Sequence, residues 1–89
     1  MHSKKYRLVK IEEFGIHNFM YDDMEGVICY LAYLKPGERG WYLYQTDASR
    51  EWYGDSPHRV HTSIIKDVEY TDDCVIVTTE NTRLTFAVD

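Results

Sequence analysis

The last third of the chain alternates apolar and polar residues with the two-residue period of a β-strand. Two such runs, residues 75–79 and 84–88, are separated by turn-forming residues, which predicts a β-hairpin. The turn is either Glu80 with Asn81 or Asn81 with Thr82. Both turns place the same side chains on one face of the hairpin: Val75, Val77, Leu84, Phe86 and Val88. The buried face is therefore independent of the register, and the chain must build a β-sheet around it.

The chain has room for one domain, residues 1–89, and this length lies near the lower limit for a single hydrophobic core. Its composition, 44% hydrophobic and 15% aromatic, is too apolar for a disordered chain. Further strand-like runs precede the hairpin, at residues 6–11, 27–34, 41–46 and 60–70. The pattern predicts a mainly β fold, a small antiparallel barrel or roll of SH3-like or OB-like type with about six strands. Residues 12–25 follow neither period cleanly, and we expect a short helix or a strand there that covers one end of the barrel.

Two of the predicted strands show where they lie in the sheet. Residues 6–11 end near Lys10, and lysine commonly protects a strand at a sheet edge, so we expect an edge strand there. In residues 60–70 the alternation slips by one residue near Ile64 and Ile65, which predicts a β-bulge.

Residues 27–46 form a predicted hairpin that is apolar on both faces. If Leu34 pairs with Trp41, Leu31, Tyr33, Tyr42 and Tyr44 share one face, and the other face consists of Ala32, Leu34, Trp41 and Leu43. A domain of this size can line its core with only one of these faces. We expect a protein partner or a second copy of the chain, in a homodimer, to cover the other.

The formal net charge of -5 is unevenly distributed along the chain. Residues 1–10 contain 4 basic and no acidic side chains, whereas the remainder contains 6 basic and 15 acidic side chains. An acidic surface repels nucleic-acid phosphates and attracts basic proteins, so we expect a basic partner and consider nucleic acid unfavourable outside the N-terminal segment. The simpler alternative is that the excess of acidic side chains only keeps a small protein soluble.

Two cysteines, Cys29 and Cys74, lie within apolar runs and lack the spacing of metal ligands. We interpret them as buried free thiols in a reducing compartment, and a single disulfide between two strands stays open as the alternative. The basic N-terminus is not followed by the apolar stretch of a signal peptide, and the longest apolar run, residues 27–34, is too short to span a membrane. We therefore expect a cytoplasmic protein with no membrane partner.

The first candidate site is aromatic. The predicted partner-binding residues are five large rings and their two polar neighbours: Trp41, Tyr42, Tyr44, Trp52, Tyr53, His58 and Arg59. Aromatic rings on loops and strands anchor protein interfaces, and on β-barrels they also stack on unpaired bases. Acidic residues around the loop at residues 47–57 favour a protein partner over nucleic acid. The alternative is that the rings complete the hydrophobic core.

The second candidate is the polar cluster at residues 58–63. Ser63 lacks the glycines of a nucleophile elbow, and no acid follows in the order of a catalytic triad. His58 and His61 would need further ligands, such as Asp55 or Glu51, to hold zinc. We therefore expect no enzyme, no cofactor and no metal site, and interpret the cluster as side chains that hydrogen-bond the strand backbone.

The third candidate is a group of acidic residues near the C-terminal hairpin: Asp67, Glu69, Asp72, Asp73 and Glu80. The group lacks the ligand spacing and central glycine of an EF-hand loop. It is typical of a solvated rim. Its more specific interpretation is mimicry, in which a small acidic protein occupies the basic cleft of a nucleic-acid-handling enzyme.

The chain resembles short uncharacterised bacterial and phage-type β proteins in the run His-Arg-Val-His-Thr-Ser at residues 58–63 and in residues 75–86. The resemblance covers about the last third of the chain and implies a β domain without an assigned activity. The small size, the acidity and the lack of enzymatic motifs are also similar to phage-encoded inhibitors of host defence, such as anti-CRISPR proteins. That similarity implies an inhibitor or adaptor.

Three functions follow, in order of expectation. The first is a non-catalytic protein-interaction module that docks on a basic partner or associates with itself. The second is a single-stranded nucleic-acid-binding barrel that uses the same rings together with Lys4, Lys5, Arg7 and Lys10. The third is a small hydrolase or metal protein centred on His58, His61 and Ser63.

Overall fold

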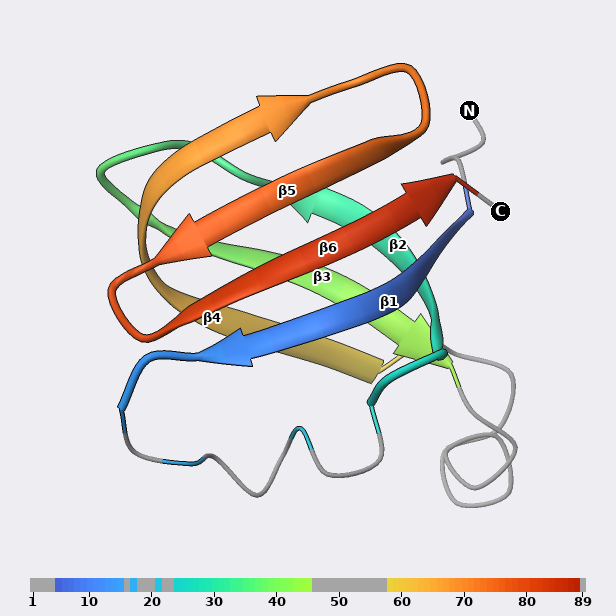
Figure 1. Ribbon diagram of the computed structural model, residues 1–89, viewed down its shortest axis with the longest axis horizontal. Helices are drawn as coiled ribbons and strands as arrows, with labels where there is room; N and C mark the ends of the chain where they lie inside the picture. Colours follow the sequence, from blue (N-terminus) through green and yellow to red (C-terminus); the bar gives the residue numbers. More distant parts are fainter. Residues whose placement is uncertain (1–4, 16, 18–20, 22–23, 46–57, 89) are drawn as a thin grey trace.

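The computed structural model describes residues 5–15, 17, 21, 24–45 and 58–88. In this part of the chain six strands form a closed antiparallel barrel in which each strand pairs with the next and the last closes on the first. The strands are β1 (Tyr6–Glu13), β2 (Ile28–Tyr33), β3 (Arg39–Gln45), β4 (His58–Tyr70), β5 (Cys74–Thr79) and β6 (Thr82–Val88). Figure 1 shows β1 and β6 in front, with β3 passing behind them. The predicted small antiparallel barrel is confirmed.

No helical element is present among the described residues. Of the segment for which a short helix or a strand is expected, Glu12 and Glu13 extend β1, while residues 16, 18–20 and 22–23 lie outside the described part. Within that described part, no helix has the length and apolar character needed to cross a membrane.

The C-terminal hairpin of β5 and β6 has the predicted buried face at four of its five residues, and Val88 is the exception. Val75 opposes Phe86 and Val77 opposes Leu84, and all four side chains are buried. The strands end at Thr79 and begin again at Thr82, so the turn is Glu80 with Asn81. Val88, the last residue of β6, is 44% exposed, because it lies where the barrel ends rather than over the core.

The inner side chains fill the barrel. The largest fully buried ones are Tyr42, Phe86, Leu8, Ile65, Leu84, Val77, Thr79 and Cys29. The rings of Tyr42 and Phe86 meet edge to face with centroids 5.2 Å apart. The barrel is therefore a packed core, and its inner face has no room for the second apolar face of the β2–β3 hairpin.

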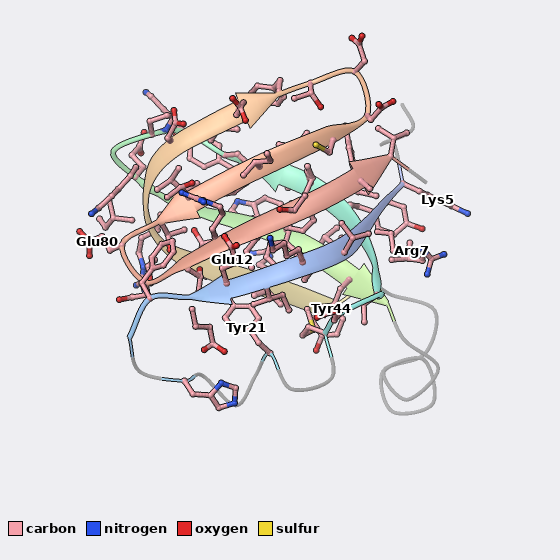
Figure 2. The ribbon with its side chains drawn as sticks, viewed as in Figure 1. Lys5, Arg7, Glu12, Tyr21, Tyr44 and Glu80 are labelled. Carbon is pink, nitrogen blue, oxygen red and sulfur yellow. The ribbon has the colours of Figure 1, made fainter. Side chains whose placement is uncertain are left out.

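β1 is not a sheet edge, contrary to our prediction, because it pairs with β6 from Tyr6 to Glu13 and thereby closes the barrel. Its pairing with β2 is short and covers Tyr6 with Cys29 and Arg7 with Ile28. The Leu8 amide then donates to the Val27 carbonyl at 3.0 Å, and β1 bulges at the next residue. Beyond this point, buried side chains from the β1–β2 connection pack against the core: Tyr21 and Met24. Figure 2 shows Tyr21 directed from this connection toward the barrel beneath β1.

β4 bends around the barrel and pairs first with β3 and then with β5. The pairing with β3 shifts between Arg39 and Trp41, and the pairing with β5 shifts between Ile65 and Asp67. These irregularities lie on either side of Ile64 and Ile65, where the sequence predicts a bulge. Each extra residue increases the local bend, which lets one 13-residue strand reach both neighbours.

Gly40 lies opposite the first of these irregularities. Its amide donates to the hydroxyl of the buried Thr62 at 2.9 Å, and that hydroxyl donates to the Ser63 carbonyl at 2.7 Å. A Cβ atom at Gly40 would collide with the backbone oxygen of Tyr33 and lie 2.6 Å from Cδ1 of Ile65. Only glycine fits this crossing without moving the backbone.

We therefore expect Gly40→Ala to lower the free energy of unfolding by about 2 kcal/mol, since overpacking against backbone forces the strands apart. Gly15→Ala is the matched control, because a Cβ there meets nothing within 4 Å. Urea denaturation followed by circular dichroism measures both variants. Equal stability of the two would contradict the close approach at Gly40.

Tyr42 provides a second test of the core. Its hydroxyl is buried and has no hydrogen-bond partner among the described residues. Burial raises the pKa of this phenol, and the nearby Tyr21, Cys29 and Tyr44 add to the rise. We expect Tyr42→Phe to keep the ring contact with Phe86 and to raise the free energy of unfolding by about 1 kcal/mol, because the unpaired hydroxyl is removed. A loss of stability in the same urea titration would show that the hydroxyl has a partner.

Candidate functional site

The register of β2 and β3 decides which rings point outward. Leu31 opposes Tyr42, and after a bulge at Ala32, Tyr33 opposes Trp41. The expected pairing of Leu34 with Trp41 is therefore wrong. The extra residue reverses the two side chains that follow it, so that Leu34 packs against the core and Tyr33 is 39% exposed.

Two of the predicted partner-binding rings point into the barrel. Tyr42 is fully buried, so it belongs to the core and cannot contact a partner in this fold. Tyr44 is half-buried and packs against the core. For these two residues, the alternative that the rings complete the core is correct, since alternation along β3 directs both inward.

The outer side of β2, β3 and β4 carries a continuous set of rings and apolar side chains with one arginine. Tyr30 opposes Leu43 and Tyr33 opposes Trp41 across β2 and β3. Across β3 and β4, Leu43 opposes Arg59 and Trp41 opposes His61. We call these six residues the aromatic face: Tyr30, Tyr33, Trp41, Leu43, Arg59 and His61.

Arg59 covers part of Trp41 within this face. The guanidinium carbon lies 4.5 Å from the centroid of the indole, a cation–π contact that directs the arginine across the strands. Arg59 and His61 are exposed, whereas Tyr30, Trp41 and Leu43 are half-buried. The aromatic face therefore presents apolar area together with one positioned cation, the combination that protein interfaces favour at their centres.

Other predicted site residues are not brought to this face by the described part of the chain. Trp52 and Tyr53 lie outside the described residues. The backbone of His58 pairs with Tyr44 at the start of β4, and its side chain is likewise outside the description. Of the seven predicted residues, Trp41 and Arg59 are the two that the structure places together on the outer surface.

The polar cluster at residues 58–63 is tied into the barrel by its hydroxyls. Ser63 accepts a hydrogen bond of 2.7 Å from the side-chain amide of Asn81 in the β5–β6 turn. Thr62 points inward and holds the Gly40 amide. Both hydroxyls thus have structural partners, and no three His, Cys, Asp or Glu side chains come together as a possible metal site within the described ranges.

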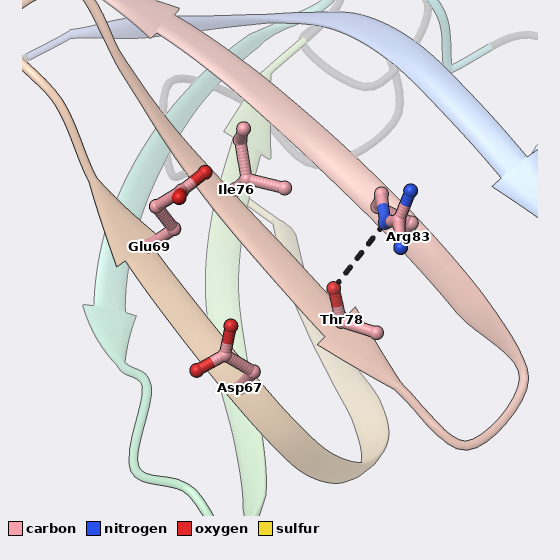
Figure 3. Close-up of a pocket in the computed structure, with 5 residues that line it drawn as sticks. All are labelled: Asp67, Glu69, Ile76, Thr78 and Arg83. Carbon is pink, nitrogen blue, oxygen red and sulfur yellow. Dashed lines mark hydrogen bonds between the residues drawn. The ribbon is translucent and has the colours of Figure 1, made fainter.

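The acidic residues lie elsewhere on the barrel. Asp67 and Glu69 project from the second half of β4, where it pairs with β5, and with Ile76, Thr78 and Arg83 they line a shallow hollow (Figure 3). Arg83 donates to the Thr78 hydroxyl at 3.4 Å and lies 3.4 Å from a carboxylate oxygen of Glu12. The acidic hollow and the aromatic face are therefore separate surfaces, on opposite sides of the bend in β4.

Comparison of the chain with protein-family models, with curated proteins and with solved structures finds no match.

The two cysteines are free in the structure and differ in exposure. Cys29 is fully buried on the inner side of β2, and burial raises the pKa of its thiol to about 12. Cys74 is half-buried on β5, with its sulfur 3.2 Å from the hydroxyl of Thr71. The prediction of free thiols is confirmed, and only Cys29 is buried as expected.

We expect Ellman's reagent at mildly alkaline pH to modify Cys74 and to leave Cys29 unreacted until the protein unfolds, because a thiol with so high a pKa forms little thiolate. Cys74→Ser should abolish the fast reaction and Cys29→Ser should preserve it. Fast labelling of Cys29 in the folded protein would contradict its place in the core.

Proposed function

We propose that the protein is a non-catalytic protein-interaction module and that the aromatic face is its docking surface. The observation that carries this proposal is the stacking of Arg59 on Trp41, on the outer side of a barrel whose interior is already filled. Tryptophan, tyrosine and arginine contribute most to binding energy in protein interfaces. A guanidinium already held over an indole loses less conformational freedom on binding than a free one.

A module of this kind acts by occupying a surface of its partner, as an inhibitor or an adaptor. Association with a second copy of the chain is the simplest form of the proposal, since two aromatic faces would cover each other. Free thiols at Cys29 and Cys74 support a reducing environment, and we place the protein in the cytoplasm on that basis.

Single-stranded nucleic acid is the second candidate ligand. The specific observation in its favour is the same: an arginine and several rings on the outside of a β-barrel resemble a platform on which bases stack. The net charge of -5 opposes it, because the protein as a whole repels phosphates.

The proposal predicts that Trp41→Ala lowers the amount of partner captured from an extract of the source cells by about tenfold or more. Tyr70→Ala is the matched control, because this ring is 68% exposed at the far end of β4, away from the aromatic face. Quantitative mass spectrometry of the captured proteins compares both variants with the wild type, after circular dichroism has verified their folds. Full retention of every partner by Trp41→Ala would refute the proposed docking surface.

Two further measurements distinguish a second copy of the chain and a nucleic acid from other partners. Sedimentation velocity over a range of concentrations detects a dimer, which should dissociate in Trp41→Ala if the partner is a second copy. Fluorescence anisotropy with labelled oligothymidylate at low salt tests the second candidate. Binding that weakens as salt rises and that requires Trp41 would favour nucleic acid over a protein partner.

A further inference from the structure

We propose that the surface docking on the aromatic face is acidic: a segment of a partner protein that places carboxylates against Arg59 and an apolar side chain against Trp41. This inference rests on the proposed function, because it specifies the chemistry of the partner. It reverses the sign that the net charge of the chain suggests, since an acidic protein is expected to attract basic partners.

The charges near the aromatic face are predominantly positive in the part of the chain that the structure describes. Arg59 belongs to the face, and Arg39 lies beside it on β3, where it is exposed and opposes Ile64. Arg39 is held against β4, because its Nε donates to the Thr62 carbonyl at 3.3 Å. Two cations therefore flank Trp41 at fixed positions along the strands.

The nearby carboxylate is already neutralised. Glu38 accepts a hydrogen bond of 2.9 Å from the Tyr33 hydroxyl and lies 3.3 Å from the ammonium of Lys35. The hydrogen bond from Tyr33 and the charge of Lys35 lower the pKa of Glu38, which keeps this carboxyl ionised and paired. Among the described residues, Glu38 is therefore paired with Tyr33 and Lys35 rather than with Arg59 or Arg39.

Acidic side chains that could balance these cations lie on other parts of the described barrel. Asp67 and Glu69 are on the half of β4 that pairs with β5. Asp72 and Asp73 form the β4–β5 turn, and Glu80 lies in the β5–β6 turn. The described barrel is thus charged asymmetrically, with acidic groups near β5 and an aromatic, cationic surface on β2, β3 and the first half of β4.

Arg59 is suited to a carboxylate in this setting. Among the described residues its contact is the stacking on Trp41, a cation–π contact that uses none of the N–H donors of the guanidinium. A guanidinium binds a carboxylate through two parallel hydrogen bonds. Stacking on an indole restricts the orientations of the guanidinium before the carboxylate binds, so less conformational entropy is lost on binding. A partner carboxylate and an adjacent apolar side chain would satisfy Arg59 and cover Trp41 together.

Three short fluorescein-labelled peptides test the inference on the full chain. They share the same leucine and phenylalanine content, and their remaining positions are glutamate, lysine or glutamine. Long-range attraction to a protein of charge -5 favours the lysine peptide, so tighter binding of the glutamate peptide cannot come from net charge. We expect the glutamate peptide to bind about tenfold more tightly than the lysine peptide in fluorescence anisotropy at low salt.

Variants assign the preference to its residues. Arg59→Gln should weaken binding of the glutamate peptide by about tenfold, because one charge-assisted pair is lost. The affinity for the glutamine peptide should change little. Lys66→Gln removes the same charge from an exposed residue on the β5-paired half of β4 and should leave all three affinities unchanged. Trp41→Ala should weaken all three peptides.

The outcomes separate the inference from the proposed function. If Trp41→Ala weakens the peptides but the lysine peptide binds best, or Arg59→Gln has no effect, the acidic partner is overturned and the docking surface stands. If Trp41→Ala changes no affinity, or no peptide binds, both are overturned. Displacement of the glutamate peptide by oligothymidylate in a Trp41-dependent manner also overturns the inference, in favour of nucleic acid.

Discussion

The pairing of β1 with β6 is the interaction on which the rest of the structure depends. It runs from Tyr6 opposite Val88 to Glu13 opposite Thr82 and turns a six-strand meander into a closed barrel. A closed barrel gives every strand an inner and an outer face, and an interior of this size is filled by the inner side chains alone. Every apolar residue on an outer face must therefore be exposed to water or covered by something outside the barrel.

This constraint has its largest effect on β2 and β3, where both faces are apolar. Tyr42 and Cys29 are fully buried inside, while Tyr30, Trp41 and Leu43 remain half-buried outside. Small barrels with a polar outer surface have no apolar side chains beyond those that fill the core. On β2, β3 and β4 the outer apolar side chains are neighbours across the strands and lie beside Arg59 and Arg39, which is why we assign binding to this surface rather than to the acidic hollow.

The parts of the fold that the sequence predicts are those with strict alternation. In the C-terminal hairpin, Val77 and Leu84 fall on the same face under either turn, so no knowledge of register is needed. The slip of alternation near Ile64 likewise marks the bend of β4 directly. Closure through β1 is not visible in the sequence, because Lys10 fits a sheet edge as well as it fits the outer face of a barrel strand.

The candidate site is predicted only in part, because its residues lie where the sequence does not alternate strictly between apolar and polar. In residues 27–34 both faces are apolar, so nothing in the pattern reveals the bulge at Ala32 that reverses Tyr33 and Leu34. Trp41 and Arg59 are each foreseeable as binding residues, whereas their contact depends on the alignment of β3 with β4. Tyr30 and Leu43 become part of the site only through that alignment.

Hydroxyl-radical footprinting of the free protein, read out by mass spectrometry, tests most directly the claim that the barrel divides its aromatic residues into a filled interior and an open face. We expect rapid oxidation of Tyr33 and Trp41 on the outside and protection of Tyr42 on the same hairpin. Oxidation of Tyr42 as fast as that of Tyr33 would contradict the inward register of β3, and with it the aromatic face.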